Sequence, residues 1–336
     1  MDGSRSMQQA IEQLLRDPED ALLARDIIGT DDPRQIAAQV AAFVGEPIAS
    51  CALFTQSVGA VFVLDLARGE RIVVKVHAFG PGSRNFATLD ELEAVYAVQA
   101  ELAARGVACA QVLAPPRSFG SGRAAAVMSY LAAPLRDDPH APSTGQAMAH
   151  ELARIKALLG DLSATGELPQ RWRLPVTLFP PAHNALFDLD RAGGDWIDKR
   201  AAAARTLLAT GATPTAMHAD FSCANVVVAG GRVAAIYDAD SVCVVDEPRV
   251  VASAAVHYTY TSVAPWIWPS REQARAFVAA YEAARGQPFD RAERARLDAA
   301  AIYALAYTAR CEHGHAGGPT GMMCAMLAAA PDCYFE

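Results

Sequence analysis

Residues 217–240 have the sequence MHADFSCANVVVAGGRVAAIYDAD, in which apolar runs are preceded and followed by polar residues. Two of the apolar runs flank Gly230-Gly231, a pair typical of a two-residue hairpin turn. A turn at these glycines pairs Asn225 with Ile236, so Asn225 and Asp238 lie at the same open end of the hairpin. The stretch therefore predicts a hairpin that brings two oxygen-bearing side chains together.

The polar residues of this stretch suit phosphoryl transfer. Mg2+ binds few protein oxygens and completes its shell with water and substrate phosphates, so Asn225 and Asp238 suit a complex of Mg2+ with a nucleotide. Asp220 precedes Asn225 by five residues and is placed to orient an attacking hydroxyl group. We expect His218 to be a structural histidine that supports the loop. The alternative is a polar turn beside an ordinary hairpin, because Asp and Asn favour turns.

The composition argues against several other classes of protein. The chain has 336 residues, enough for two lobes that share a cleft. Its net charge of -8 argues against a nucleic-acid partner, since phosphate backbones are bound chiefly through clustered Lys and Arg. The seven cysteines include no CxxC pair, which argues against a zinc ribbon. Neither a secretory signal pattern nor a long apolar run is present, so we expect a cytoplasmic protein with no membrane partner.

The sequence before this stretch predicts a small sheet with one helix against it. Residues 1–45 have helical features, and residues 50–77 have the pattern of a β-hairpin. A helix is expected over 89–105, followed by short strands over 107–112 and 124–128.

The sequence after residue 133 predicts a mainly helical part. The expected helices cover 144–160, 191–209, 271–285 and 291–313. Two of them begin with a capping box, in which Ser270 is followed by Gln273 and Asp290 by Glu293. The boundary between the two parts is expected near Tyr130.

The stretch resembles the aminoglycoside phosphotransferase and choline kinase group, which is related to the protein kinases. The resemblance is carried by His218-Ala219-Asp220, by Asn225 and by the run Ile236–Asp240. It implies that Asp220 is the catalytic aspartate and that Asn225 and Asp238 bind Mg2+. It also implies that His218 supports the catalytic loop.

The resemblance implies nucleotide-binding residues in the N-terminal part as well. Lys75 looks like the lysine that holds the nucleotide phosphates, and Glu93 like its ion-pair partner, with Glu91 as the alternative. Ser57 and Gly59 stand where a phosphate-covering loop is expected, although the GxGxxG motif is absent. A solvent-facing lysine on an edge strand is the alternative for Lys75.

Residues 126–131 resemble the hinge against which adenine stacks, and the candidate contacts are Met128, Ser129, Tyr130 and Leu131. The fold implied is α+β and bilobal, like that of protein kinases. A small antiparallel sheet with the N-terminal helices would form the nucleotide-binding lobe over 1–130. A larger helical lobe over 131–336 would bind the substrate, with ATP between the lobes.

We therefore expect an ATP- and Mg2+-dependent phosphotransferase that acts on a hydroxyl group of a small molecule. Acids in the helical part favour an amine-bearing acceptor such as an aminoglycoside antibiotic, and these are Asp188, Asp190, Asp195 and Glu312. The alternatives are another antibiotic, a homoserine, choline or sugar-type alcohol, and a nucleotide-binding pseudokinase. The role of Asp240 and the oligomeric state are left open.

Overall fold

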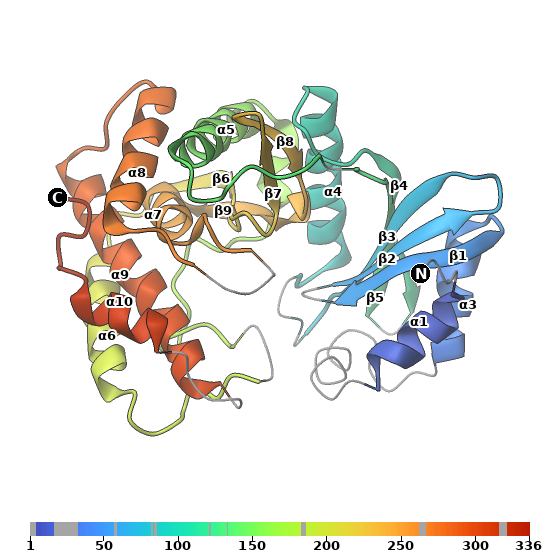
Figure 1. Ribbon diagram of the computed structural model, residues 1–336, viewed down its shortest axis with the longest axis horizontal. Coiled ribbons are helices and arrows are strands. Elements are labelled where there is room, and N and C mark those ends of the chain that lie inside the picture. Colours follow the sequence, from blue (N-terminus) through green and yellow to red (C-terminus); the bar gives the residue numbers. More distant parts are fainter. Residues whose placement is uncertain are drawn as a thin grey trace. The chain divides into compact units, whose positions relative to one another are not determined.

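The chain forms two compact units (Figure 1). The computed structural model describes residues 5–16, 33–56, 59–81, 83, 86–120, 122–132, 134–182, 186–261, 267–315 and 321–336. Unit 1 comprises Met1–Ala103, Ala110–Ala132 and His183–Leu186, and unit 2 comprises Ala104–Cys109, Ala133–Ala182 and Phe187–Glu336.

Unit 1 is built on an antiparallel sheet of five strands in the order β1-β2-β3-β5-β4. The strands are β1 (Ile48–Gln56), β2 (Ala60–Leu66), β3 (Arg71–Ala78), β4 (Val112–Gly120) and β5 (Arg123–Ser129). The helices are α1 (Met7–Leu14), α3 (Pro33–Val44) and α4 (Leu89–Ala104). This sheet, followed by a mainly helical region, confirms the predicted α+β fold class.

The two faces of β3 serve different purposes, because side chains alternate along a strand. Val74 lies in the hydrophobic core that the sheet shares with α1 and α3. Lys75 and His77 point to the opposite face, where the His77 ring lies 2.8 Å from the hydroxyl of Tyr96 on α4. The sheet is thus covered on one face by α1 and α3, and α4 packs on the face that carries Lys75.

The prediction of a strand over residues 107–112 is wrong. The edge strand β4 begins only at Val112 and contains Pro115 and Pro116. Proline lacks a backbone N–H and is therefore tolerated at a sheet edge, where a missing donor costs no ladder hydrogen bond. The pairing of β4 with β5 is irregular across these prolines.

Unit 2 combines helices with two short antiparallel ribbons, β6 with β9 and β7 with β8. Its elements are α5 (Pro142–Gly160), η1 (Ser163–Glu167), α6 (Asp195–Leu208), β6 (Pro214–His218), β7 (Val226–Ala229), β8 (Arg232–Ile236), η2 (Ala239–Ser241), β9 (Val242–Asp246), α7 (Glu247–His257), α8 (Arg271–Arg285), α9 (Arg291–Gly314) and α10 (Met322–Ala329). No helix in the described part of the chain is long and apolar enough to cross a lipid bilayer.

Both predicted capping boxes are confirmed, at the starts of α8 and α9. The helices α7 and α10 were not expected. The start of α7 nevertheless carries a recognisable signal, because Pro248 lies in its first turn directly after Asp246 and Glu247.

The predicted β7–β8 hairpin is present, but its register differs by one residue from the expected one. Ala229 pairs with Arg232 around the turn, whereas Val226 pairs with Ile236, so Ala234 is an extra residue that forms a bulge. The turn glycines have positive φ angles, and their N–H groups donate to the two carboxylate oxygens of Asp137 at 3.1 and 2.9 Å. The bulge therefore places Asn225 beside Tyr237, directly after β8, and not opposite Ile236.

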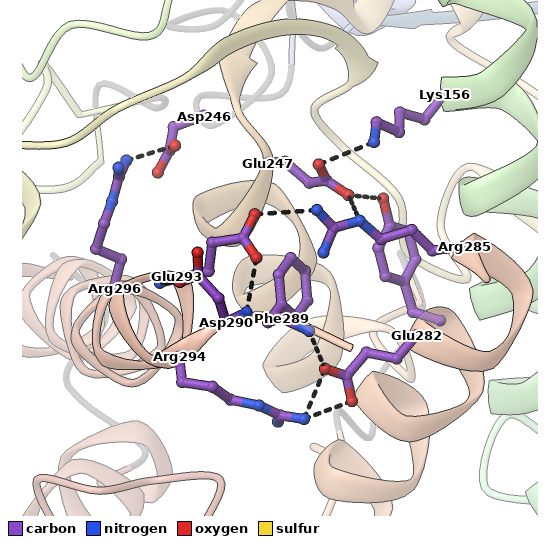
Figure 2. A network of polar contacts seen from close by, with 11 residues as sticks. Lys156, Asp246, Glu247, Glu282, Arg285, Phe289, Asp290, Glu293, Arg294 and Arg296 are labelled. Carbon is purple, nitrogen blue, oxygen red and sulfur yellow. Dashed lines mark hydrogen bonds and ion pairs between the residues drawn. The ribbon is translucent and has the colours of Figure 1, made fainter. Parts of the chain in front are cut away.

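A buried ionic network surrounds the start of α7 (Figure 2). The carboxylate of Glu247 accepts a hydrogen bond from the Tyr281 hydroxyl (2.8 Å) and pairs with Lys156 (2.9 Å) and Arg285 (3.1 Å). Arg285 also pairs with Glu293 at 2.9 Å. The network therefore joins α7 to α5, α8 and α9.

Replacing Glu247 with Ala should lower the free energy of unfolding by about 3–5 kcal/mol, because the largely buried Arg285 side chain would lose one of its two acidic partners and Lys156 would lose its ion pair. Urea unfolding followed by circular dichroism measures this loss. The matched control is Glu272→Ala on the exposed surface of α8, for which we expect a change within about 0.5 kcal/mol. Equal stability of the two variants would contradict the role given to the network.

Candidate active site

The loop of residues 219–225 connects β6 to β7 and is held by main-chain hydrogen bonds. The Ala219 N–H donates to the oxygen of Ser241 (3.0 Å), and the Cys223 N–H donates to the oxygen of Tyr258 (2.8 Å) directly after α7. The loop is thus attached both to the segment before β9 and to the end of α7.

Asp220 and Asn225 contact each other at the two ends of this loop. Asp220 is exposed, whereas Asn225 is buried. The Asn225 Nδ2 donates to the main-chain oxygen of Asp220 (3.1 Å) and to its Oδ2 (2.9 Å). These two acceptors fix the amide orientation, and the Asn225 Oδ1 has no hydrogen-bond partner among the described residues. The amide oxygen is therefore available to a cation.

Asp238 lies next to Asn225 at the open end of the hairpin. The Tyr237 N–H donates to the main-chain oxygen of Asn225 at 2.6 Å, which places Asp238 one residue beyond this bond. Asp238 has a left-handed backbone (φ 51°, ψ 38°), and it is the only non-glycine residue with positive φ among those described. Such conformations cost roughly 1–3 kcal/mol and cluster at functional sites.

The donor set fits Mg2+. An amide oxygen and a carboxylate are hard oxygen ligands, and a site with two of them leaves room for water and phosphate oxygens in the Mg2+ shell. Asn225 and Asp238 are therefore the residues that would hold the ion.

His218 is the last residue of β6, directly before the loop, and it is almost fully buried. Its Nδ1 accepts a hydrogen bond from the Asp220 N–H at 3.3 Å, and its ring contacts Phe221 edge to face. Burial lowers the pKa of His218, although the negative charges of Asp220, Asp238 and Asp240 act in the opposite direction. A neutral ring that supports the Asp220 main chain agrees with the structural role expected for it.

Lys75, the candidate phosphate ligand of unit 1, is buried in β3 between Val61 of β2 and Ala126 of β5. It is therefore not a solvent-facing lysine on an edge strand. Gly59 lies close to it, because a Cβ at Gly59 would be 3.1 Å from the Lys75 Cε and 3.0 Å from the main-chain oxygen of Val76. Only glycine fits this approach without displacing its neighbours. Ser57 lies outside the described residues.

The acidic partner of Lys75 stays a prediction. Glu93 is an exposed residue of α4, whereas Glu91 accepts a hydrogen bond from the Ala87 N–H at 2.6 Å and so belongs to the start of the helix. The buried face of α4 carries Tyr96, which contacts His77 two residues beyond Lys75.

The predicted hinge begins where β5 ends. Met128 is buried, and Ser129 closes the ladder, with its N–H donating to the oxygen of Gln111 at 2.9 Å. Tyr130 is 41% exposed and lies against Arg71, and Leu131 follows it. The ladder between β3 and β5 ends at Ser129, so Tyr130 and Leu131 lie beyond it.

The acids expected to attract a cationic acceptor serve partly structural purposes. The Glu312 carboxylate accepts hydrogen bonds of 2.9–3.1 Å from three N–H groups at the start of α10. Asp188 accepts a hydrogen bond from the N–H of Asp190, and Asp195 lies in the first turn of α6.

The sequence did not indicate two residues that position the loop, namely Tyr258 directly after the unexpected helix α7 and Gly145 on the expected helix α5. Tyr258 is buried, and its ring stacks on Phe277 with the centroids 5.3 Å apart. Gly145 of α5 packs against the same ring, since a Cβ there would be 3.1 Å from the phenol carbon and oxygen of Tyr258. The proline in the first turn of α7 is the signal that could have revealed this part of the site.

His257, the last residue of α7, is partly buried. Its Nδ1 donates to the oxygen of Ser253 (3.1 Å), and its Nε2 lies 3.1 Å from the hydroxyl of Thr308 on α9. Burial lowers the pKa of His257 to about 4, against an opposing effect of the Ser253 oxygen.

Comparison with protein families gives one match of large extent. The model described as "Phosphotransferase enzyme family" (APH) matches residues 56–299 of the chain. No curated protein matches the chain.

Solved structures share the fold. Amicoumacin kinase hAmiN, in complex with AMP-PNP, Ca2+ and Ami, has a TM-score of 0.63 and 12% identity over 88% of this chain and 93% of that chain. A thermostable mutant of APH(4)-Ia, with AMP-PNP and hygromycin B, has a TM-score of 0.52 and 14% identity over 89% and 96%. The gentamicin complex of APH(2″)-IIa has a TM-score of 0.50 and 14% identity over 90% and 97%.

Replacing Gly145 with Ala should lower the free energy of unfolding by about 1–3 kcal/mol, because the new methyl group would press on the buried Tyr258 ring. The matched control is Gly160→Ala in the same helix, where a Cβ would meet nothing within 4 Å. Chemical denaturation of both variants measures the difference. An unchanged free energy of unfolding for Gly145→Ala would show that Tyr258 is free to move.

Acid should destabilise the protein through His257. The unfolded histidine binds a proton below its ordinary pKa of 6.5, whereas the folded one does so only near pH 4, so stability falls as the pH drops through this window. Between pH 7 and 4.5 the loss from this residue should be roughly 2 kcal/mol. Unfolding curves at both pH values should show a smaller loss for His257→Gln than for the unchanged protein. An equal loss of stability in His257→Gln and in the unchanged protein would contradict the role given to His257.

Proposed function

Because the chain belongs to the phosphotransferase enzyme family, we propose that it transfers the γ-phosphate of ATP to a hydroxyl group of a small molecule. The observation that carries the proposal is the contact of Asn225 with Asp220, which leaves one carboxylate at the surface and one amide oxygen available to a metal ion. Phosphoryl transfer needs mainly positioning and neutralisation of charge, and these groups supply both.

In this proposal Asp220 orients the acceptor. Its exposed carboxylate accepts a hydrogen bond from the attacking hydroxyl and takes up the proton as the phosphoryl group is transferred. The Asn225 Nδ2 holds the Asp220 carboxylate at 2.9 Å, and the neutral His218 ring holds the Asp220 N–H. The base is thus fixed through both its side chain and its main chain before the substrate binds.

The nucleotide would be held by the metal ligands and by further residues that the family resemblance indicates. Mg2+, when bound to Asn225 and Asp238, neutralises charge on the nucleotide phosphates. Lys75 would contact the same phosphates, and its burial strengthens its interaction with an anion. Gly59 would let the chain approach Lys75 closely, and Met128, Ser129, Tyr130 and Leu131 would contact adenine. The complexes of hAmiN and APH(4)-Ia with AMP-PNP support the choice of an adenine nucleotide.

Replacing Asp220 with Asn should lower the rate of phosphoryl transfer about 1,000-fold, because the amide cannot accept the proton. Binding of ATP with Mg2+, measured by titration calorimetry, should change less than about twofold. Turnover is followed as ADP release with a panel of hydroxyl compounds.

The matched control is Asp161→Asn, an exposed aspartate at the end of α5. It should keep full turnover. Unchanged turnover of Asp220→Asn would overturn the assignment of the base, and a lack of ADP release with every hydroxyl compound would overturn the proposed reaction.

A further inference from the structure

Two aromatic residues outside the proposed catalytic set stack on each other beside the catalytic loop. Tyr260 and Trp268 have ring centroids 5.3 Å apart and planes that differ by only 8°. Both residues are partly exposed. The other stacked pair near the loop, Tyr258 with Phe277, is buried and has a packing role. The partly exposed pair therefore offers aromatic surface to a ligand, which the buried pair cannot do.

The pair is held in place by the end of α7. The Tyr260 N–H donates to the oxygen of His257 (2.8 Å), and the Thr259 hydroxyl donates to the oxygen of Ile267 (2.8 Å), beside Trp268. The His257 ring meets the Trp268 ring edge to face at 5.4 Å. Both aromatic rings are thus fixed before a ligand binds, which reduces the entropy lost on binding.

The same segment is joined to the proposed base. The Cys223 N–H of the catalytic loop donates to the oxygen of Tyr258, two residues before Tyr260. The pKa of Tyr260 is raised by burial and, in addition, by the negative charge of Asp220. Tyr260 therefore lies within electrostatic reach of the carboxylate that would receive the hydroxyl proton.

The polar atoms of the pair are available. Neither the Tyr260 hydroxyl nor the Trp268 Nε1 has a hydrogen-bond partner among the residues that the structure describes. Tyr and Trp with an apolar face and an unused polar atom are typical of binding surfaces, where a ligand covers the face and pairs with the polar atom.

Recognition of the acceptor by ion pairs has weaker support in unit 2 than recognition by aromatic stacking. Glu312 is occupied by the start of α10, and Asp188 by the N–H of Asp190. The His257 beside Trp268 is neutral near pH 7, because its pKa is about 4. Two of the four acids expected to attract a cationic acceptor thus accept hydrogen bonds from the backbone, whereas Asp190 and Asp195 are exposed.

We propose that Tyr260 and Trp268 form the acceptor-binding surface and that they take an uncharged, hydroxyl-bearing ring. The flat face of the ring packs on the aromatic pair, ring oxygens pair with the Tyr260 hydroxyl and the Trp268 Nε1, and one ring hydroxyl lies toward Asp220. This inference rests on the proposed function, and it narrows the acceptor from any small alcohol to a ring compound recognised by stacking.

The test measures binding separately from turnover. Titrations followed by calorimetry use the Asp220→Asn variant with methyl glucoside, methyl galactoside, methyl mannoside and myo-inositol as uncharged rings. Gentamicin, choline and homoserine are the charged probes. We expect at least one uncharged ring to bind, and Trp268→Ala or Tyr260→Ala to weaken its binding about tenfold or more. Binding of ATP with Mg2+ should change less than about twofold, which also shows that these variants fold.

The matched control is Trp196→Ala, an exposed tryptophan on α6 whose loss should leave ring binding unchanged. The variants Trp268→Phe and Tyr260→Phe keep an aromatic face and should give smaller losses than the alanine variants. Binding of charged probes alone, or ring binding that Trp268→Ala leaves unchanged, would overturn the inference. Ring binding that depends on Trp268 without ADP release from the unchanged protein would overturn the proposed reaction and leave the binding surface standing.

Discussion

The hydrogen bond from the Tyr237 N–H to the main-chain oxygen of Asn225 is the constraint on which the proposed site depends. It extends the β7–β8 pairing beyond the bulge at Ala234, so that one ligand candidate directly precedes the first strand and the other follows the second. Asp238 reaches this place at the cost of a left-handed backbone, which the surrounding hydrogen bonds stabilise. The closeness of the two proposed metal ligands is therefore a consequence of hairpin geometry, because both residues belong to one local element.

A second set of constraints holds this hairpin and the proposed catalytic loop, residues 219–225, within unit 2. Asp137 fixes the turn at Gly230-Gly231, while Tyr258 fixes the loop through Cys223. Tyr258 in turn follows α7, whose start is held by the buried pairing of Glu247 with Arg285. Buried ion pairs contribute little net stability but strongly disfavour arrangements that separate them, so the network specifies where α7 lies more than it stabilises the fold. The position of the proposed base thus depends on residues far from it in the sequence.

This difference between local and distant constraints explains what could be predicted. The hairpin, the capping boxes at Ser270 and Asp290 and the family were recognised, because each depends on residues close together in the chain. The register was displaced by one residue, because a bulge at an ordinary alanine has no sequence signal. The strand β4 was misplaced because Pro115 and Pro116 argue against a strand unless its position at the sheet edge is known. The support from Tyr258, Gly145 and Glu247 involves packing between distant segments, which periodicity does not reveal.

The same difference explains why the sequence indicates the proposed reaction more clearly than the acceptor. The groups proposed for phosphoryl transfer lie on one hairpin and its preceding loop, so a short motif contains them. The groups proposed to bind the acceptor, Tyr260 and Trp268, follow α7 and meet through tertiary packing. Charged residues in the sequence suggested a cationic acceptor, yet Glu312 is used by the backbone of α10. A count of acids measures their number and not their availability, whereas the partly exposed aromatic pair, with polar atoms unpaired among the described residues, is the observation behind the proposed acceptor surface. Substrate inference in this family of folds therefore needs the packing around the loop, even where the chemistry is evident from the motif.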